Sequence, residues 1–177
     1  MKKVIIAVAI AMVAVFAQAA TATWSVNNIV GPDGNAGSVG WLVEIYSADV
    51  SYTYDAAKAG TITELFSGAT VQAGTTTNVR ISQAGVGDFA AGESGSWYAV
   101  IYDAATVDAA KNYIVSEDVD WSVNAQGKNI TVAFGAMTAT TSANKFLGST
   151  WQAVPEPTSG ILLLLGVAGL ALRRRRA

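Results

Sequence analysis

Trp41-Leu42-Val43-Glu44-Ile45-Tyr46 and Trp97-Tyr98-Ala99-Val100-Ile101-Tyr102 are the two stretches that decide the fold of this chain. Successive side chains of a strand point to opposite faces, so each stretch presents two different rows of residues. Trp97, Ala99 and Ile101 share one face, and Tyr98, Val100 and Tyr102 share the other. Trp41, Val43 and Ile45 repeat this arrangement, with Glu44 on the second face between Leu42 and Tyr46. Strands that are apolar on both faces are typical of the centre of packed sheets.

The sequence on either side of these stretches has a strand-and-turn pattern. Short runs rich in Val, Ile, Thr, Tyr and Trp alternate with clusters of Gly, Asn, Asp and Ser, and no helical stripe of useful length appears. Turns are expected at 31–35, 85–88 and 91–95, where glycine can take positive φ. The pattern predicts an all-β fold, a single small β-sandwich-like domain. The expected strands are 23–30, 39–46, 61–66, 75–81, 96–103, 112–116 and 129–134.

An internal similarity accompanies the two central stretches. Each is followed by Asp-Ala-Ala-Lys, at 55–58 and at 108–111, and the run 73–81 is similar to 126–134. A duplicated half-sandwich would explain this similarity. Chance similarity within an Ala-, Thr- and Gly-rich sequence would explain it as well.

The N-terminus has the pattern of an export signal. Lys2 and Lys3 precede an apolar run over 4–17, and Ala17 and Ala19 are the small residues that signal peptidase reads before Ala20. The apolar run is shorter than the ~20 residues that a permanent membrane helix needs. We therefore predict a signal peptide at 1–19 and a secreted domain at 20–153.

Composition restricts the chemistry of that domain. Residues 20–155 hold 12 acidic and five basic side chains, a net charge of −7, which disfavours nucleic acid as a partner. The chain has no cysteine and no histidine, which removes thiol catalysis, histidine-activated nucleophiles and the usual zinc sites. We expect no catalytic residue, metal or cofactor, and a core that folds without disulfides.

Three groups of residues are the remaining site candidates. Acids that are close in sequence could form the carboxylate pair of a glycosidase, but solvated strand and turn positions are the simpler interpretation. Oxygen ligands at 33–35 and 117–120 lack the spacing of a calcium loop. Trp24, Trp121 and Trp151 are candidates for stacking on sugar rings, whereas Trp41 and Trp97 are expected in the core. The acids are Asp103, Asp108, Glu117, Asp118 and Asp120.

The C-terminus carries three consecutive signals, which we assign to residues 154–177. Pro155-Glu156-Pro157 fixes an extended segment, because proline has a restricted φ and no amide proton. An apolar segment at 160–172 follows, and its 12-residue run at 161–172 would span ~18 Å as a helix, against a hydrocarbon core of ~30 Å. Arg173, Arg174, Arg175 and Arg176 would hold the end of this short apolar helix on the cytoplasmic side. The tail is a poor permanent anchor and is predicted to contact the inner membrane transiently.

This order of signals resembles the PEP-CTERM sorting signal. The resemblance implies processing by an exosortase, a membrane enzyme thought to cleave near Pro-Glu-Pro, in organisms that typically make exopolysaccharide. It implies export across the inner membrane to the cell surface or extracellular matrix, and it says nothing about the chemistry of the domain. The middle domain is also similar, more loosely, to the Ala-, Thr- and Gly-rich domains that such proteins often carry.

The sequence therefore favours a non-enzymatic surface protein. We expect a structural or adhesive component of the exopolysaccharide or biofilm matrix, whose partners are polysaccharide or matrix proteins besides signal peptidase and exosortase. A carbohydrate-binding module is the alternative, and an ice-binding module is disfavoured because regular Thr-x-Thr ladders are missing. A glycan-cleaving enzyme is the third possibility.

Overall fold

The structure is a computed structural model that describes residues 20–72, 78–87, 89–123 and 129–155. Its elements are β1 (Ala20–Asn27), β2 (Leu42–Ser47), α1 (Tyr54–Lys58), β3 (Phe66–Ala69), β4 (Val71–Gln72), β5 (Val79–Gly87), β6 (Ser94–Tyr102), η1 (Val107–Ala109), β7 (Asn112–Val115), β8 (Val119–Ser122), β9 (Ile130–Ala136) and β10 (Gln152–Ala153). The predicted signal peptide at 1–19 and the tail beyond Pro155 lie outside the described residues.

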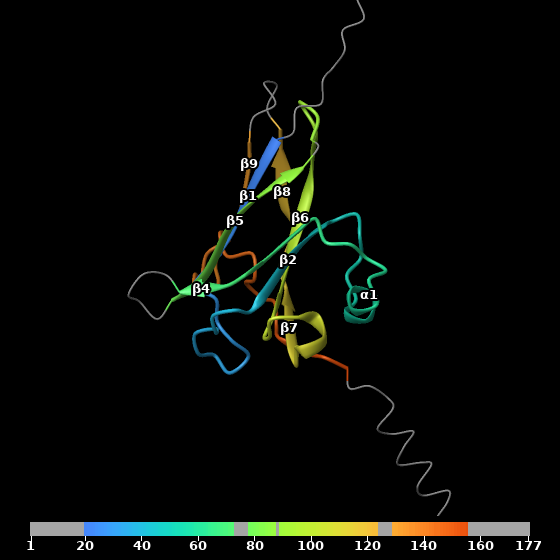
Figure 1. Cartoon of the computed structure of the whole chain (residues 1–177). Coiled ribbons are helices and arrows are strands. Elements are labelled where there is room, and N and C mark those ends of the chain that lie inside the picture. Colours follow the sequence, from blue (N-terminus) through green and yellow to red (C-terminus); the bar gives the residue numbers. More distant parts are fainter. Residues whose placement is uncertain (1–19, 73–77, 88, 124–128, 156–177) are drawn as a thin grey trace, which may run out of the picture.

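The strands form two packed sheets, which confirms the predicted all-β fold. One sheet has the order β4-β5-β1-β9, and the other has the order β10-β7-β6-β2-β3 with β8 also paired to β6. Most pairs are antiparallel, but β1 and β9 run parallel. Figure 1 shows the sheet of β1, β5 and β9 on one side of β2 and β6, and α1 on the other side.

The pair β2 and β6 occupies the centre of the second sheet, as predicted. Its register places Val43 opposite Ile101 and Ile45 opposite Ala99. These side chains are fully buried and face the first sheet, where they meet Trp24, Ile81, Val132 and Phe134. Trp97 is 1% exposed in this core, so its predicted position is confirmed, and Trp41 is half-buried against it.

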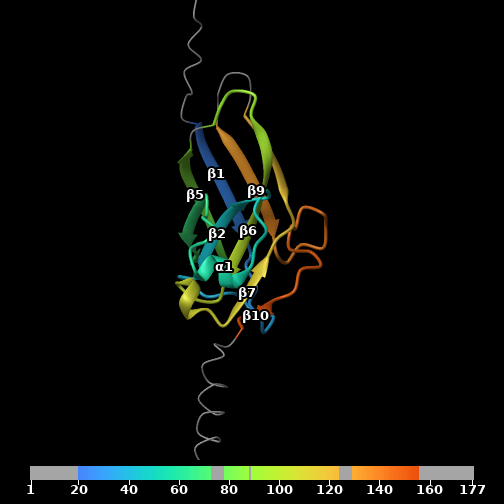
Figure 2. The ribbon, with the colours of Figure 1, turned by 90° about the vertical axis from the view of Figure 1, so that its right-hand side faces the viewer.

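The opposite face of β2 and β6 is covered by a second buried layer. It gathers all six tyrosines of the chain, together with Val100 and Ala110. The segment that covers it includes α1, where the Thr53 hydroxyl caps the helix by accepting from the Ala56 amide at 3.2 Å. Figure 2 shows α1 lying over the strands of this sheet. We call Tyr46, Tyr52, Tyr54, Tyr98, Tyr102 and Tyr113 the tyrosine layer.

Glu44 is the buried acceptor beneath the tyrosine layer. It is 7% exposed, and its Oε2 accepts hydrogen bonds from the hydroxyls of Tyr46 at 2.5 Å and Tyr102 at 3.0 Å. The Tyr52 hydroxyl donates to that of Tyr102 at 3.0 Å, which extends the chain of hydrogen bonds. Burial raises the pKa of Glu44, although the two phenol hydrogen bonds act to lower it.

Several predicted boundaries are wrong for identifiable reasons. The expected strand at 61–66 overlaps β3 only at Phe66, because the chain before it passes over the tyrosine layer. The expected turn at 85–88 contains the last residues of β5, which pair with β1. A Cβ atom at Gly85 would lie 2.2 Å from the Phe66 ring, so this glycine allows a close approach instead of a turn. The turn at 31–35 is present, with Gly34 at φ +78°.

The two similar halves of the sequence occupy related positions in the fold. β2 and β6 are antiparallel neighbours, and the Asp-Ala-Ala-Lys segments that follow them meet through an ion pair of Lys58 with Asp108 at 3.4 Å. β5 and β9 flank β1 on opposite sides and run in opposite directions. A duplicated half-sandwich with a two-fold relation between its copies would give this placement.

Within the described part of the chain, no helix is long and apolar enough to cross a membrane. The predicted apolar segment at 160–172 lies outside the described residues.

The tyrosine layer predicts an unusual alkaline titration. Burial raises the pKa of all six tyrosines above the usual 10.0, that of Tyr98 to about 12. Near pH 10 the unfolded chain therefore releases phenolic protons that the folded chain keeps, and the free energy of unfolding falls as pH rises further. We expect phenolate absorbance to remain low at pH 10 and to appear together with the loss of circular dichroism. Ionisation of several tyrosines near pH 10 in a fully folded protein would contradict this account.

Candidate functional site

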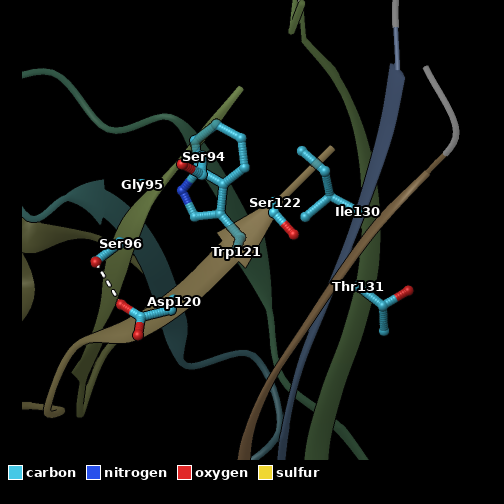
Figure 3. Close-up of a pocket in the computed structure, with 8 residues that line it drawn as sticks. All are labelled: Ser94, Gly95, Ser96, Asp120, Trp121, Ser122, Ile130 and Thr131. Atoms are coloured by element: carbon cyan, nitrogen blue, oxygen red, sulfur yellow. Dashed lines mark hydrogen bonds between the residues drawn. The ribbon is translucent and has the colours of Figure 1, made fainter. Parts of the chain in front are cut away.

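An open groove of about 610 Å³ lies where β8 and β9 approach each other at the edge of the sandwich. One wall comes from β6 and β8 of the larger sheet, and the other comes from β9 of the smaller sheet (Figure 3). An aromatic ring, hydroxyl groups and one carboxylate line this groove. The lining residues are Ser94, Gly95, Ser96, Asp120, Trp121, Ser122, Ile130 and Thr131.

Trp121 is the aromatic residue of the groove, and its position follows from strand pairing. It lies directly opposite Gly95, whose missing side chain makes room for the indole. A Cβ at Gly95 would lie 3.2 Å from the nearest indole atoms. The indole packs on Trp97 and Phe89, each with ring centroids 5.0 Å away. These contacts fix a half-buried ring at the groove without using a hydrogen bond.

The Trp121 indole N–H is buried and has no hydrogen-bond partner in the described part of the chain. Figure 3 shows the ring beside the β6 backbone at Ser94 and Gly95. A buried donor without an acceptor costs about 1–3 kcal/mol, so the aromatic packing must offset this cost. Packing on Trp97 and Phe89, and not hydrogen bonding, therefore determines where the ring lies.

Polar groups lie on both walls beside the ring. The Ser96 hydroxyl donates to Asp120 Oδ1 at 2.7 Å, which orients the carboxylate along the groove. Asp120, Ser122 and Thr131 are exposed. Such a surface can accept and donate hydrogen bonds next to an apolar face.

The other two candidate tryptophans do not line this groove. Trp24 is 1% exposed and belongs to the core between the sheets, so its predicted stacking role is wrong: position 24 lies on the inner face of β1. Trp151 is half-buried, packs edge-on against Trp41 at 5.7 Å between ring centroids, and donates to the Val30 carbonyl at 3.1 Å.

Trp121 and Trp151 also lie far apart. Trp121 pairs with Gly95 at the start of β6, whereas Gln152 pairs through Tyr113 with Tyr102 at its end. Seven residues of strand separate these positions, or roughly 23 Å. The two tryptophans therefore form no common platform.

The acids that are close in sequence have separate local roles. Asp103 accepts from the amides of Lys111 and Asn112 at 2.8 and 2.9 Å, and Asp108 pairs with Lys58. Asp118 lines a different cavity from Asp120. Among the described residues, no group of three or more acids could hold a metal ion, and the Asp33 carboxylate accepts from the Asn35 amide and side chain.

Sequence reasoning named Trp121 and, among the acids, Asp120, but missed the other residues of the groove. Ser94, Ser96 and Thr131 become neighbours only when β8 pairs with β6 beside β9, and the four-residue strand β8 was not predicted. The available signal was the spacing of Gly95 and Trp97, which lie on the same face of one strand. A glycine at that position leaves space beside Trp97 for a large side chain from a neighbouring strand.

The groove lies at the end of the domain away from the C-terminus. The chain enters at Ala20 and leaves at Pro155, which lie at opposite ends of the sandwich (Figures 1 and 2). Val154 donates to the Lys111 carbonyl at 2.8 Å, and Pro155 is exposed. Ala17, Ala19, Glu156, Pro157 and the arginines at 173–176 lie outside the described residues.

Comparison with known proteins assigns the tail. No curated protein and no solved structure matches the chain. The family model of the PEP-CTERM protein-sorting motif matches residues 153–176, the region identified from Pro155, Glu156, Pro157 and the four arginines. The chain therefore carries a PEP-CTERM sorting motif, which makes it an exported, extracellular protein that exosortase processes.

Proposed function

We propose that the domain is a non-enzymatic, adhesive component of the extracellular matrix that binds polysaccharide through the groove at Trp121. The observation that carries this proposal is a half-buried indole, fixed by Trp97 and Phe89, in a groove that the Asp120 carboxylate and serine hydroxyls also line. Sugar rings offer apolar C–H faces with hydroxyls around their edges. An aromatic face flanked by hydrogen-bonding groups complements both parts of such a ligand.

The charge of the groove indicates which polysaccharides fit. Asp120 is the one charged residue among the described residues that line it. The domain as a whole carries a net charge of −7 over residues 20–155. Uronate-rich polymers would be repelled by this charge, whereas neutral or amino-sugar polymers would not.

The position of the groove supports an adhesive role. The chain leaves the domain at the opposite end, so a protein attached to the surface through its processed C-terminal end would present the groove outward. Single sites of this kind bind weakly. Many copies on one surface would raise retention by orders of magnitude through multivalency.

The carboxylates argue for binding without cleavage. A glycosidase needs two carboxyl groups across the scissile bond, about 5 to 9.5 Å apart. In the described lining of the groove, Asp120 has no second acid facing it. We therefore expect no release of reducing sugar.

Blocking the groove should abolish retention on polysaccharide. Ser122 is exposed on β8 and lies outside the Trp121 packing contacts, and Figure 3 shows its hydroxyl directed towards β9. Ser122→Arg should therefore fill the groove without unfolding the domain. Beads coated with many copies of the processed protein are passed over immobilised neutral β-glucan, chitosan and alginate. We expect at least about tenfold weaker retention of the variant, equal to ~1.4 kcal/mol, on β-glucan or chitosan.

Ser82→Arg is the matched control, because Ser82 is exposed on β5 away from the groove and the charge change is the same. Trp121→Ala should lose retention as well, with some loss of stability from its ring contacts. Equal retention of the native protein and Ser122→Arg would contradict the proposal. Sugar release that Asp120→Asn abolishes would contradict the non-enzymatic part.

Tail removal should leave the whole folded domain intact. Gln152 and Ala153 pair with β7, and Val154 packs against the tyrosine layer, so peptide bonds before Pro155 are held in the fold. We expect the mature chain to end at or after Pro155 and to lack the arginine cluster. Intact-mass spectrometry of protein recovered from the cell surface measures this end. A mature chain that keeps Arg173–Arg176, or one that ends before Gln152, would be contrary to this expectation.

A further inference from the structure

A second cavity of about 370 Å³ opens on the face of the tyrosine layer. Tyr52, Tyr98 and Tyr113 line it, together with Val115, Asp118 and Gln152. It lies over the outer face of β6 and β7, and none of the described residues lines both this cavity and the groove at Trp121. Neither the sorting motif nor the proposed polysaccharide binding uses it.

The phenol hydroxyls of this cavity have already donated their protons within the fold. Tyr98 donates to the Val50 carbonyl at 2.7 Å, and Tyr113 donates to Gln152 Oε1 at 2.7 Å. Tyr52 donates to the Tyr102 hydroxyl at 3.0 Å, and Tyr102 in turn donates to Glu44. Each phenol has one proton, so these oxygens can only accept a further hydrogen bond. The cavity is therefore rich in acceptors.

The charge at the cavity has one sign. Asp118 lies in its lining, and among the described residues no lysine or arginine lines it. The carboxylate is close enough to add to the effect of burial, which raises the pKa of Tyr98 to about 12. Lys58 lies near the tyrosine layer, but its ammonium group pairs with Asp108 at 3.4 Å.

We propose that the tyrosine cavity binds an alkylammonium group. The ammonium would donate to the phenol oxygens and face Asp118, and its alkyl part would pack among the aromatic rings and Val115. Aromatic rings attract cations, and a nearby carboxylate adds a counter-charge. A neutral sugar fits less well, because it has no positive charge to face Asp118.

Titration with butylammonium, followed by the tyrosine ring signals in nuclear magnetic resonance, tests this site on the whole processed protein. We expect saturable shifts of Tyr52, Tyr98 and Tyr113 with a millimolar Kd that weakens at high salt. Pentanol, which is neutral and one methylene longer, should still bind at least about tenfold more weakly. Choline and glucosamine are the further arms: the first has no N–H donor, and the second carries its ammonium on a sugar ring.

Two isosteric variants with the same change in net charge separate a local site from general electrostatics. Asp118→Asn removes the cavity carboxylate, and Asp120→Asn, two residues later, removes one that lines the other groove. Both positions are exposed, so neither change should unfold the domain. We expect about fivefold or more loss of butylammonium affinity for Asp118→Asn and no change for Asp120→Asn.

Three results would overturn the proposal: no saturable shift with butylammonium, equal affinity for pentanol, or an equal effect of the two variants. Retention on polysaccharide is measured separately with Ser122→Arg. A failure of this site is therefore distinguishable from a failure of the groove at Trp121.

Discussion

The pairing of β2 with β6 is the interaction on which the rest of the structure depends. Both strands carry large apolar or aromatic side chains on both faces, so neither face can be left to solvent. One face is buried by the β4-β5-β1-β9 sheet and the other by the tyrosine layer with α1. The domain needs both covers, because burial of apolar area is its main source of stability in the absence of disulfides.

The second cover has a polar requirement that the first does not. Phenol groups are costly to bury unless their hydroxyls are paired, and Glu44 supplies the acceptor at which two of them converge. The price of this arrangement is a buried carboxylate whose pKa is raised by desolvation. Because Glu44 lies in the central strand, it fixes the positions of the phenols that point to it. The same network uses the hydroxyl proton of Tyr52, which lines the cavity.

The sequence was most informative where local pattern and burial agree. The two central strands, the position of Trp97 and the tail motif were predictable, because alternation and motif spacing are local properties. The short strands β4, β8 and β10 were not, since two to four residues carry no periodic signal. Trp24 and Gly85 were misassigned because their roles depend on the opposite sheet and on the Phe66 ring. The groove was half predictable: Trp121 and Asp120 were named, but the serines of β6 and the residues of β9 join them only through strand pairing and sheet packing.

Native-state hydrogen exchange, residue by residue, tests most directly whether β2 and β6 form a doubly covered centre. If both faces are sealed, the amides of 97–102 and 43–46 should exchange only through global unfolding, and they should be the slowest in the domain. The amides of α1 should exchange with them or slightly faster, because the helix is part of the second cover. Slowest exchange in β1 and β9, with β6 exchanging through local opening, would contradict the account.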